Sequence, residues 1–174
     1  MDGIKLYDGS DPAAVASVCE TYSISTEEFA SLRAKTVAAK ATAYCPYSQF
    51  RVGAALLAVD ESAAGATTWV SGANVENASY PVGTCAERVA LGTAVVSGIK
   101  KFRALGVATD VSPPSSPCGM CRQFIREFCG TSMPVFMFDR DNNFAVLTVI
   151  QLLPMSFGPD SLPSPEELLA NRPT

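Results

Sequence analysis

Residues 82–94 read VGTCAERVALGTA, and this stretch combines a reactive pair of side chains with a helix-forming pattern. Cys85 stands two positions before Glu87, and apolar residues then recur at helical spacing until Gly98, which is suited to end a helix. A helix N-terminus carries partial positive charge, which favours the thiolate form of a cysteine placed there. The stretch therefore predicts a helix that begins beside a thiolate and a carboxylate.

A second stretch, SSPCGMCRQFIREF at residues 115–128, predicts another helix whose first turn carries two cysteines. Cys118 and Cys121 are three positions apart, so they lie on one face of that turn, and Pro117 is suited to a helix start. Taken alone, this pair is also typical of a redox dithiol or of half a structural zinc site. The first stretch favours a shared metal ion, because it supplies a third sulfur atom.

Three thiolates from two helix starts would leave one position of a tetrahedral zinc ion open. Structural zinc sites are closed by four protein ligands, whereas three ligands and a water molecule are typical of catalytic zinc. Glu87 is placed to accept and relay the proton of that water. Three thiolates exceed the charge of Zn²⁺, and we expect Arg88 and Arg122 to offset the excess by hydrogen bonding to sulfur.

The composition describes one domain that acts on a small molecule. The chain has 174 residues, of which 48% are hydrophobic and 17% are charged, and its formal net charge is -4. Its lysines and arginines are scattered, so we expect no nucleic-acid polymer as a partner. There is no histidine, which leaves carboxylate, thiolate or metal-bound water for proton transfer.

The amino terminus and the cysteine content predict an intracellular protein. No run of about 18 apolar residues occurs, and the first residues, MDGIKLYDGSDP, lack a signal-peptide core, so we expect no membrane segment and a cytoplasmic location. Six cysteines without a secretory signal favour thiols or metal ligands over disulfides. Cys19, Cys45 and Cys129 lie outside both motifs, and we expect them to be buried or inert thiols.

Alternating patterns predict an α/β fold, namely a three-layer α/β/α sandwich with a mixed five-stranded sheet. The expected strands are 50–59, 67–75, 102–109, 133–139 and 144–148. The expected helices start at 26, 85 and 117, with a brief helical turn at 149–154. We expect the first two strands to pair antiparallel through an exposed loop and the middle of the sheet to contain parallel pairs.

Four blocks of sequence occur in order along most of the chain. They are YSQFRVGAALLA at 47–58, GANVENASYPVGTCAERVALGTAV at 72–95, SPCGMCRQ at 116–123 and LLPMSFGPDSL at 152–162. Together they resemble the small homotetrameric cytidine deaminases with a zinc ion bound by three cysteines, and CAE with PCGMC resembles the general signature of nucleobase deaminases. The resemblance implies one zinc ion per chain.

The resemblance also implies catalytic roles. Cys85, Cys118 and Cys121 would bind zinc, and Glu87 would protonate N3 of cytosine while a zinc-activated water attacks C4. The same carboxyl group would then pass a proton to the departing amino group. The backbone amide of Ala86 would contact the carbonyl oxygen of the base.

Substrate contacts are implied for three further side chains. Asn74 and Glu76 match the pair that binds ribose in the family, and Phe50 would face the base. The spacing of Asn74 and Glu76 on a strand puts both on one face, with Val75 turned into the core.

Two aromatic residues are implied to complete the site of another subunit. Tyr80 and Phe157 would reach an adjacent pocket, so a homotetramer would complete each site. The implied reaction converts cytidine and 2′-deoxycytidine to uridine and 2′-deoxyuridine with release of ammonia, in pyrimidine salvage. The alternative is a deaminase of a related nucleoside-like compound, such as a nucleoside antibiotic, which need not keep the Asn74 and Glu76 pair.

The two ends of the chain are longer than the family core needs. Residues 1–25 are expected to be an extension packed loosely on the zinc-dependent cytidine deaminase domain, which we assign to residues 26–162. Residues 163–174 are expected to be a C-terminal tail. The proline-rich sequence after Pro154 is expected to run along a surface or a neighbouring subunit.

Overall fold

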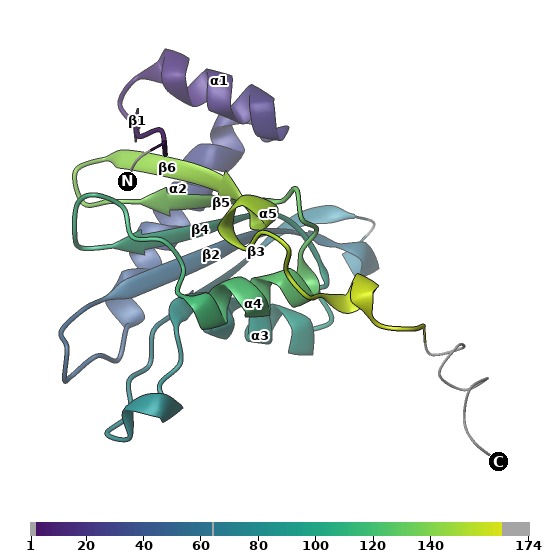
Figure 1. Cartoon of the computed structure of the whole chain (residues 1–174). Helices are drawn as coiled ribbons and strands as arrows, with labels where there is room; N and C mark the ends of the chain where they lie inside the picture. Colours follow the sequence, from purple (N-terminus) through teal and green to yellow (C-terminus); the bar gives the residue numbers. More distant parts are fainter. Residues whose placement is uncertain (1–2, 64, 165–174) are drawn as a thin grey trace.

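The computed structural model describes residues 3–63 and 65–164, which form a central sheet with helices on both faces (Figure 1). The strands are β1 (Tyr7–Asp8), β2 (Val52–Asp60), β3 (Ala66–Ala73), β4 (Lys101–Thr109), β5 (Pro134–Phe138) and β6 (Asn143–Thr148). The α-helices are α1 (Pro12–Tyr22), α2 (Thr26–Ala39), α3 (Ala86–Val96), α4 (Gly119–Phe128) and α5 (Val149–Leu152). Short 3₁₀ turns are η1 (Lys40–Thr42), η2 (Glu61–Ala63), η3 (Tyr80–Val82) and η4 (Pro159–Ser161).

The predicted three-layer sandwich with a mixed sheet is confirmed. The strand order is β1-β6-β5-β4-β2-β3, in which β2 and β3 pair antiparallel and β4 and β5 pair parallel. Helices α1 and α2 cover one face, and α3 and α4 cover the other (Figure 1). Within the described ranges, no helix has the length and apolar character needed to cross a membrane.

The predicted number of strands was wrong, because the sheet has six strands rather than five. The additional strand, β1, pairs antiparallel with β6 through Tyr7 opposite Phe144 and Asp8 opposite Asn143. A strand of two residues is too short to show any period in the sequence. It forms because β6 would otherwise leave an unpaired edge, and the ring of Tyr7 stacks on Phe144 with centroids 5.2 Å apart.

The expected loose packing of the N-terminal extension was also wrong. Asp11 caps α1 by accepting a hydrogen bond from the amide of Ala13 at 2.9 Å, and Pro12 occupies the first turn. Val18 and Cys19 are each 3% exposed, because α1 packs them into the core on the α2 side of the sheet. The Asp-Pro start was a usable signal for this helix, whereas its small apolar residues give only a weak helical pattern.

Alternation along the strands divides the core between the two faces of the sheet. On β2, Ala54 and Leu56 pack toward α3 and α4, whereas Ala55 and Leu57 pack toward α1 and α2. All four of these side chains are fully buried. Because β2 is covered on both faces, it holds the two helix layers in fixed positions relative to each other.

Close packing fixes α3 against β3. A Cβ atom on Gly72 of β3 would lie 2.5 Å from the amide nitrogen of Ala90 and 2.8 Å from the carbonyl oxygen of Ala86. Glycine is therefore required for the backbone of α3 to approach the strand this closely. The N-terminus of α3, and with it Cys85, takes its position from this contact.

We predict that Gly72→Ala lowers the free energy of unfolding by about 1–3 kcal/mol, because the added methyl group forces the helix away from the strand. Gly92→Ala on α3 is the control, since a Cβ there meets nothing within 4 Å. That control should raise stability by about 0.5–1 kcal/mol through helix propensity. Urea unfolding followed by circular dichroism measures both, and equal effects of the two variants would contradict the prediction.

Candidate active site

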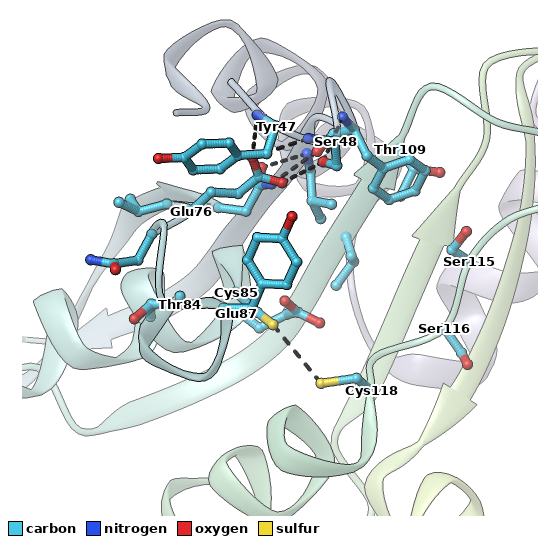
Figure 2. Close-up of a pocket in the computed structure, with 18 residues that line it drawn as sticks. Tyr47, Ser48, Glu76, Thr84, Cys85, Glu87, Thr109, Ser115, Ser116 and Cys118 are labelled. Atoms are coloured by element: carbon cyan, nitrogen blue, oxygen red, sulfur yellow. Dashed lines mark hydrogen bonds between the residues drawn. The ribbon is translucent and has the colours of Figure 1, made fainter. Parts of the chain in front are cut away.

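Three cysteine sulfur atoms from two helix starts come together on the α3 and α4 side of the sheet. The Sγ atoms of Cys85, Cys118 and Cys121 all lie within 4.8 Å of one another, and those of Cys85 and Cys118 are 3.9 Å apart (Figure 2). A Zn–S bond of about 2.3 Å places sulfur atoms about 3.8 Å apart in a tetrahedral site. All three are free cysteines, so the spacing of this three-sulfur cluster fits zinc and excludes a disulfide.

The helix termini direct positive charge at the three-sulfur cluster. Cys85 is the N-cap of α3 and Cys118 is the N-cap of α4, and neither helix has a side-chain capping hydrogen bond. The first backbone N–H groups of a helix have no acceptor within the helix. They and the helix dipoles therefore favour negative charge at these cysteines.

The three thiols perturb one another strongly. The hydrogen bond with Cys121 lowers the pKa of Cys85 to about 5, and Arg88 and Cys118 also lower it, against the effect of burial. The same hydrogen bond raises the pKa of Cys121, and burial adds to the rise. The cluster thus holds one thiolate readily and resists further negative charge, which a divalent cation would offset.

Arg88 lies beside Cys85 with part of its donor capacity unused. Its Nη2 donates to the carbonyl oxygen of Gly83 at 3.1 Å. Its Nε is buried and has no hydrogen-bond partner in the part of the chain that the structure describes. A cationic group with a spare donor, next to a cysteine whose pKa it lowers, suits an electron-rich metal-bound sulfur atom.

The prediction for Arg122 was wrong in its hydrogen-bond acceptor. Its Nε donates to the carbonyl oxygen of Pro117 and its Nη1 to that of Leu152, each at 2.8 Å. Its Nη2 donates to the hydroxyl of Ser116 at 2.9 Å. Because the guanidinium reaches back along the loop instead of to sulfur, Arg122 fixes the residues that lead into Cys118.

Glu87 lies at the base of a cavity of about 700 Å³ that is shared with Cys85 and Cys118 (Figure 2). The carboxyl group is on the first turn of α3, and the residue is only 4% exposed. Burial raises the pKa of Glu87 above its ordinary value. A buried carboxyl group of raised pKa, facing a cavity beside three thiols, is suited to proton transfer.

Asn74 and Glu76 line the same cavity just beyond the end of β3. The side-chain amide of Asn74 donates to the carbonyl oxygen of Phe50 at 2.9 Å and accepts from the amide of Val52 at 2.8 Å. The expectation that Val75 turns into the core was wrong, since Val75 is 45% exposed. The chain has left the sheet at this point, so strand alternation no longer determines which side chain is buried.

The carboxylate of Glu76 is held by the loop that carries Tyr47 and Ser48. It accepts from the amides of Tyr47 at 2.9 Å and Ser48 at 3.3 Å, and from the hydroxyl of Ser48. These hydrogen bonds lower the pKa of Glu76, the one from the Ser48 hydroxyl most of all. The sequence reasoning missed Ser48 as a site residue, although it lies in the first of the four blocks.

The aromatic residues of the prediction separate into two groups. Phe50 and Tyr80 line the cavity of their own chain, and the ring of Tyr80 lies 6.2 Å from that of Tyr47. Tyr80 is 77% exposed, which leaves it free to contact a second molecule. Phe157 is 61% exposed and is not among the described residues that line the cavity.

Ala86 and Thr109 are buried beside the site. Ala86 is the first residue of α3 and is fully buried. Thr109 lines the cavity at the end of β4, and its buried hydroxyl has no hydrogen-bond partner within residues 3–63 and 65–164. No pattern in the sequence singled out Thr109, because its place in the site depends on where β4 ends.

Comparison with known proteins agrees with this arrangement. A family model described as the cytidine and deoxycytidylate deaminase zinc-binding region matches residues 25–137. The chain belongs to this family. It is 45% identical over 131 residues to the cytidine deaminase of Sporosarcina psychrophila, a match that covers 75% of this chain and 92% of that protein. It is 41% identical over 123 residues to the cytidine deaminase of Halalkalibacterium halodurans, covering 71% of this chain and 89% of that protein.

Solved structures show the same relationship. The crystal structure of cytidine deaminase from Burkholderia pseudomallei matches with a TM-score of 0.68 at 37% identity, covering 74% of this chain and 98% of that one. That from Mycobacterium leprae matches with a TM-score of 0.60 at 32% identity, covering 73% and 98%. The predicted family is therefore confirmed, and membership in a zinc-binding deaminase family agrees with the three-sulfur cluster.

We predict that the purified cytidine deaminase family member contains about one zinc ion per chain, measured by atomic emission after dialysis. Cys118→Ser replaces a sulfur ligand and should lower retained zinc at least about tenfold. Cys45→Ser is the matched control, because Cys45 lies outside the three-sulfur cluster, and it should keep its zinc. Full zinc content in the Cys118 variant would contradict the assignment of the site.

Proposed function

We propose that this chain is a zinc-dependent hydrolase that deaminates cytidine and 2′-deoxycytidine to uridine and 2′-deoxyuridine with release of ammonia. One observation carries the proposal, namely that the buried carboxyl group of Glu87 and the three-sulfur cluster meet at one cavity. The enzyme class follows from membership in the deaminase family. The choice of substrate is supported by the cavity, which places polar side chains around a mainly apolar space.

The zinc site would supply the nucleophile of the reaction, an activated water molecule. Cys85, Cys118 and Cys121 would hold the zinc ion, which would supply Lewis acidity and lower the pKa of a water molecule toward neutrality. The side chain of Arg88 stabilises the negative charge of the three sulfur ligands, since it already lowers the pKa of Cys85. Arg122 holds the loop before Cys118, which keeps the second helix start in register with the first.

Glu87 carries the protons of the reaction. Burial favours its protonated form, so it can accept a proton from the attacking water and donate it to N3 of the cytosine ring. A second proton then passes through the same carboxyl group to the amino group on C4, which leaves as ammonia. One water molecule is consumed, one C–N bond breaks, and Glu87 ends in the state in which it began.

Asn74 and Glu76 orient the sugar. The hydrogen bonds from the 47–48 loop keep the Glu76 carboxylate ionised and fixed at the cavity wall, where it can accept from a ribose hydroxyl. Asn74 ties the end of β3 to the start of β2, and Phe50 adds an aromatic ring to the cavity wall that would face the base. The presence of this pair on the cavity wall favours a nucleoside over a nucleoside-like antibiotic.

We predict that Glu87→Gln retains zinc but lowers kcat by about 10³-fold or more, because both proton transfers depend on one carboxyl group. Absorbance of cytidine follows the reaction directly. Glu61→Gln is the control, since Glu61 forms an exposed ion pair with Lys101 away from the cavity. Retained turnover in the Glu87 variant would refute the assigned role, whereas a zinc-loaded wild-type protein without cytidine turnover would refute the function.

We also propose that the enzyme is a homotetramer in which Tyr80 and Phe157 complete the pocket of an adjacent subunit. Support comes from the apolar side chains left exposed near the cavity mouth. These are Tyr44 at 56%, Tyr47 at 51%, Val75 at 45%, Tyr80 at 77% and Val82 at 63% exposed. A cluster of this kind is typical of an interaction surface. A cytoplasmic location stays a prediction from the amino-terminal sequence, and a role in pyrimidine salvage stays a prediction from the resemblance.

Sedimentation or light scattering tests the assembly. We expect a mass of about four times the 18.3 kDa of one chain, because closed symmetric assemblies of identical chains are the common form. A protein that is monomeric at assay concentration yet fully active would contradict the proposed sharing of sites. Phe157→Ala should raise the KM for cytidine in the assembled protein.

A further inference from the structure

The segment that follows α5 is attached to α4 on both sides of Phe157. We call residues 153–162 the C-terminal segment; it leaves α5 and passes the end of α4 (Figure 1). The guanidinium of Arg126 donates from Nε to the hydroxyl of Ser156 at 3.1 Å and from Nη2 to the carboxylate of Asp160. One turn earlier, the side-chain amide of Gln123 donates to the carbonyl oxygen of Phe157 at 3.0 Å.

Arg126 is placed as a buried anchor and not as a surface charge. The residue is only 7% exposed, whereas its ion-pair partner Asp160 has a side chain that is 72% exposed. Gly158 passes directly over the guanidinium, because a Cβ atom there would overlap Cζ, Nη1 and Nη2 of Arg126. A side chain at position 158 would therefore have to displace the guanidinium of Arg126 or the segment itself.

These contacts restrain the backbone that carries the ring of Phe157. They hold Ser156 before it, its own carbonyl group and Asp160 after it, yet the residue remains 61% exposed. An exposed aromatic ring on an otherwise free segment would lose conformational entropy on binding. Attachment to a helix removes the backbone part of that cost before binding, which is preorganisation.

The helix that provides the anchor is also the helix that begins at the three-sulfur cluster. Cys118 is the N-cap of α4, Cys121 lies in its first turn, and Arg126 lies near its end. One rigid element therefore relates the metal site of a chain to the aromatic ring that the chain presents outward. Lysine could not replace Arg126 fully, because a single ammonium group lacks the fork of donors that reaches two acceptors.

We propose that Arg126 is a positioning residue that, with Gly158, presents Phe157 to the nucleoside pocket of a neighbouring subunit. The inference rests on the proposed function, in which Phe157 contacts a nucleoside held by another chain. Within residues 3–63 and 65–164, the side-chain hydrogen bonds of Arg126 go to Ser156 and Asp160, and Arg126 does not line the cavity. It acts on binding through Phe157.

Steady-state kinetics with cytidine test this role. Arg126→Met should raise KM about tenfold while kcat changes less than about twofold, because the ring contributes to binding and not to proton transfer. Asp160→Asn and Gly158→Ala should raise KM in the same direction, the first because it weakens the ion pair and the second because it displaces the segment. Zinc content should stay at the wild-type value in all three variants.

A double-mutant cycle separates positioning from general structure. If Arg126 acts through Phe157, the KM of Arg126→Met combined with Phe157→Ala should equal that of Phe157→Ala alone. Fully additive effects on KM would overturn the proposal, as would an unchanged KM in Phe157→Ala. Should Arg126→Met not fold, the same cycle with the exposed Asp160→Asn decides the question.

The controls distinguish this inference from the function on which it rests. Arg140→Met removes an exposed arginine of a different surface pair, and its KM should equal that of the wild type. Wild-type turnover of cytidine with unchanged KM in the Arg126, Gly158 and Asp160 variants would refute the inference alone. Absence of turnover in zinc-loaded wild-type protein would refute the proposed function.

Discussion

The structure depends on two helix N-termini that meet beyond the carboxyl ends of strands β3 and β4. Strands β3 and β4 each pair antiparallel with β2, so they run in the same direction, and β5 runs parallel to β4. The helices that connect parallel strands start at the same edge, which brings Cys85 and Cys118 together. Close packing of α3 on Gly72 sets the distance between the backbone of α3 and the sheet. A shift of an ångström or two in either helix would separate the sulfur atoms.

Proton chemistry without histidine follows from the same arrangement. The helix start that supplies Cys85 also supplies Glu87 two residues later. Because α3 packs against the sheet, Glu87 is buried. Burial and the negative charge of Cys85 raise its pKa, so the group can both hold and release a proton. The neighbouring Arg88 carries the compensating positive charge. Metal site and proton carrier are thus two consequences of one helix position.

Helix α4 connects the three-sulfur cluster to the C-terminal segment. Helix α4 carries Cys118 at one end and Arg126 near the other, and the C-terminal segment is bonded to it. Tyr80 and Phe157 remain 77% and 61% exposed in their own chain. Their exposure agrees with an assembly in which pockets are shared. The rigidity of α4 would then fix the position of Phe157, which would contact a neighbouring subunit, relative to the three-sulfur cluster of its own chain.

The amino-acid sequence by itself determined the elements that bury a face and the residue types that carry the chemistry. The strands of the sheet centre and the cysteines at helix starts show a local period or spacing, and the resemblance of four ordered blocks indicated the family. Tertiary structure alone decided the pairing of β1, the exposure of Val75 and the acceptors of Arg122. These three features depend on partners that are distant in sequence. They are the pairing of a sheet edge, the burial of a residue beyond the end of a strand, and the hydrogen bonds of a long polar side chain. Local periodicity records which face of an element is buried, but it does not record which partner covers it.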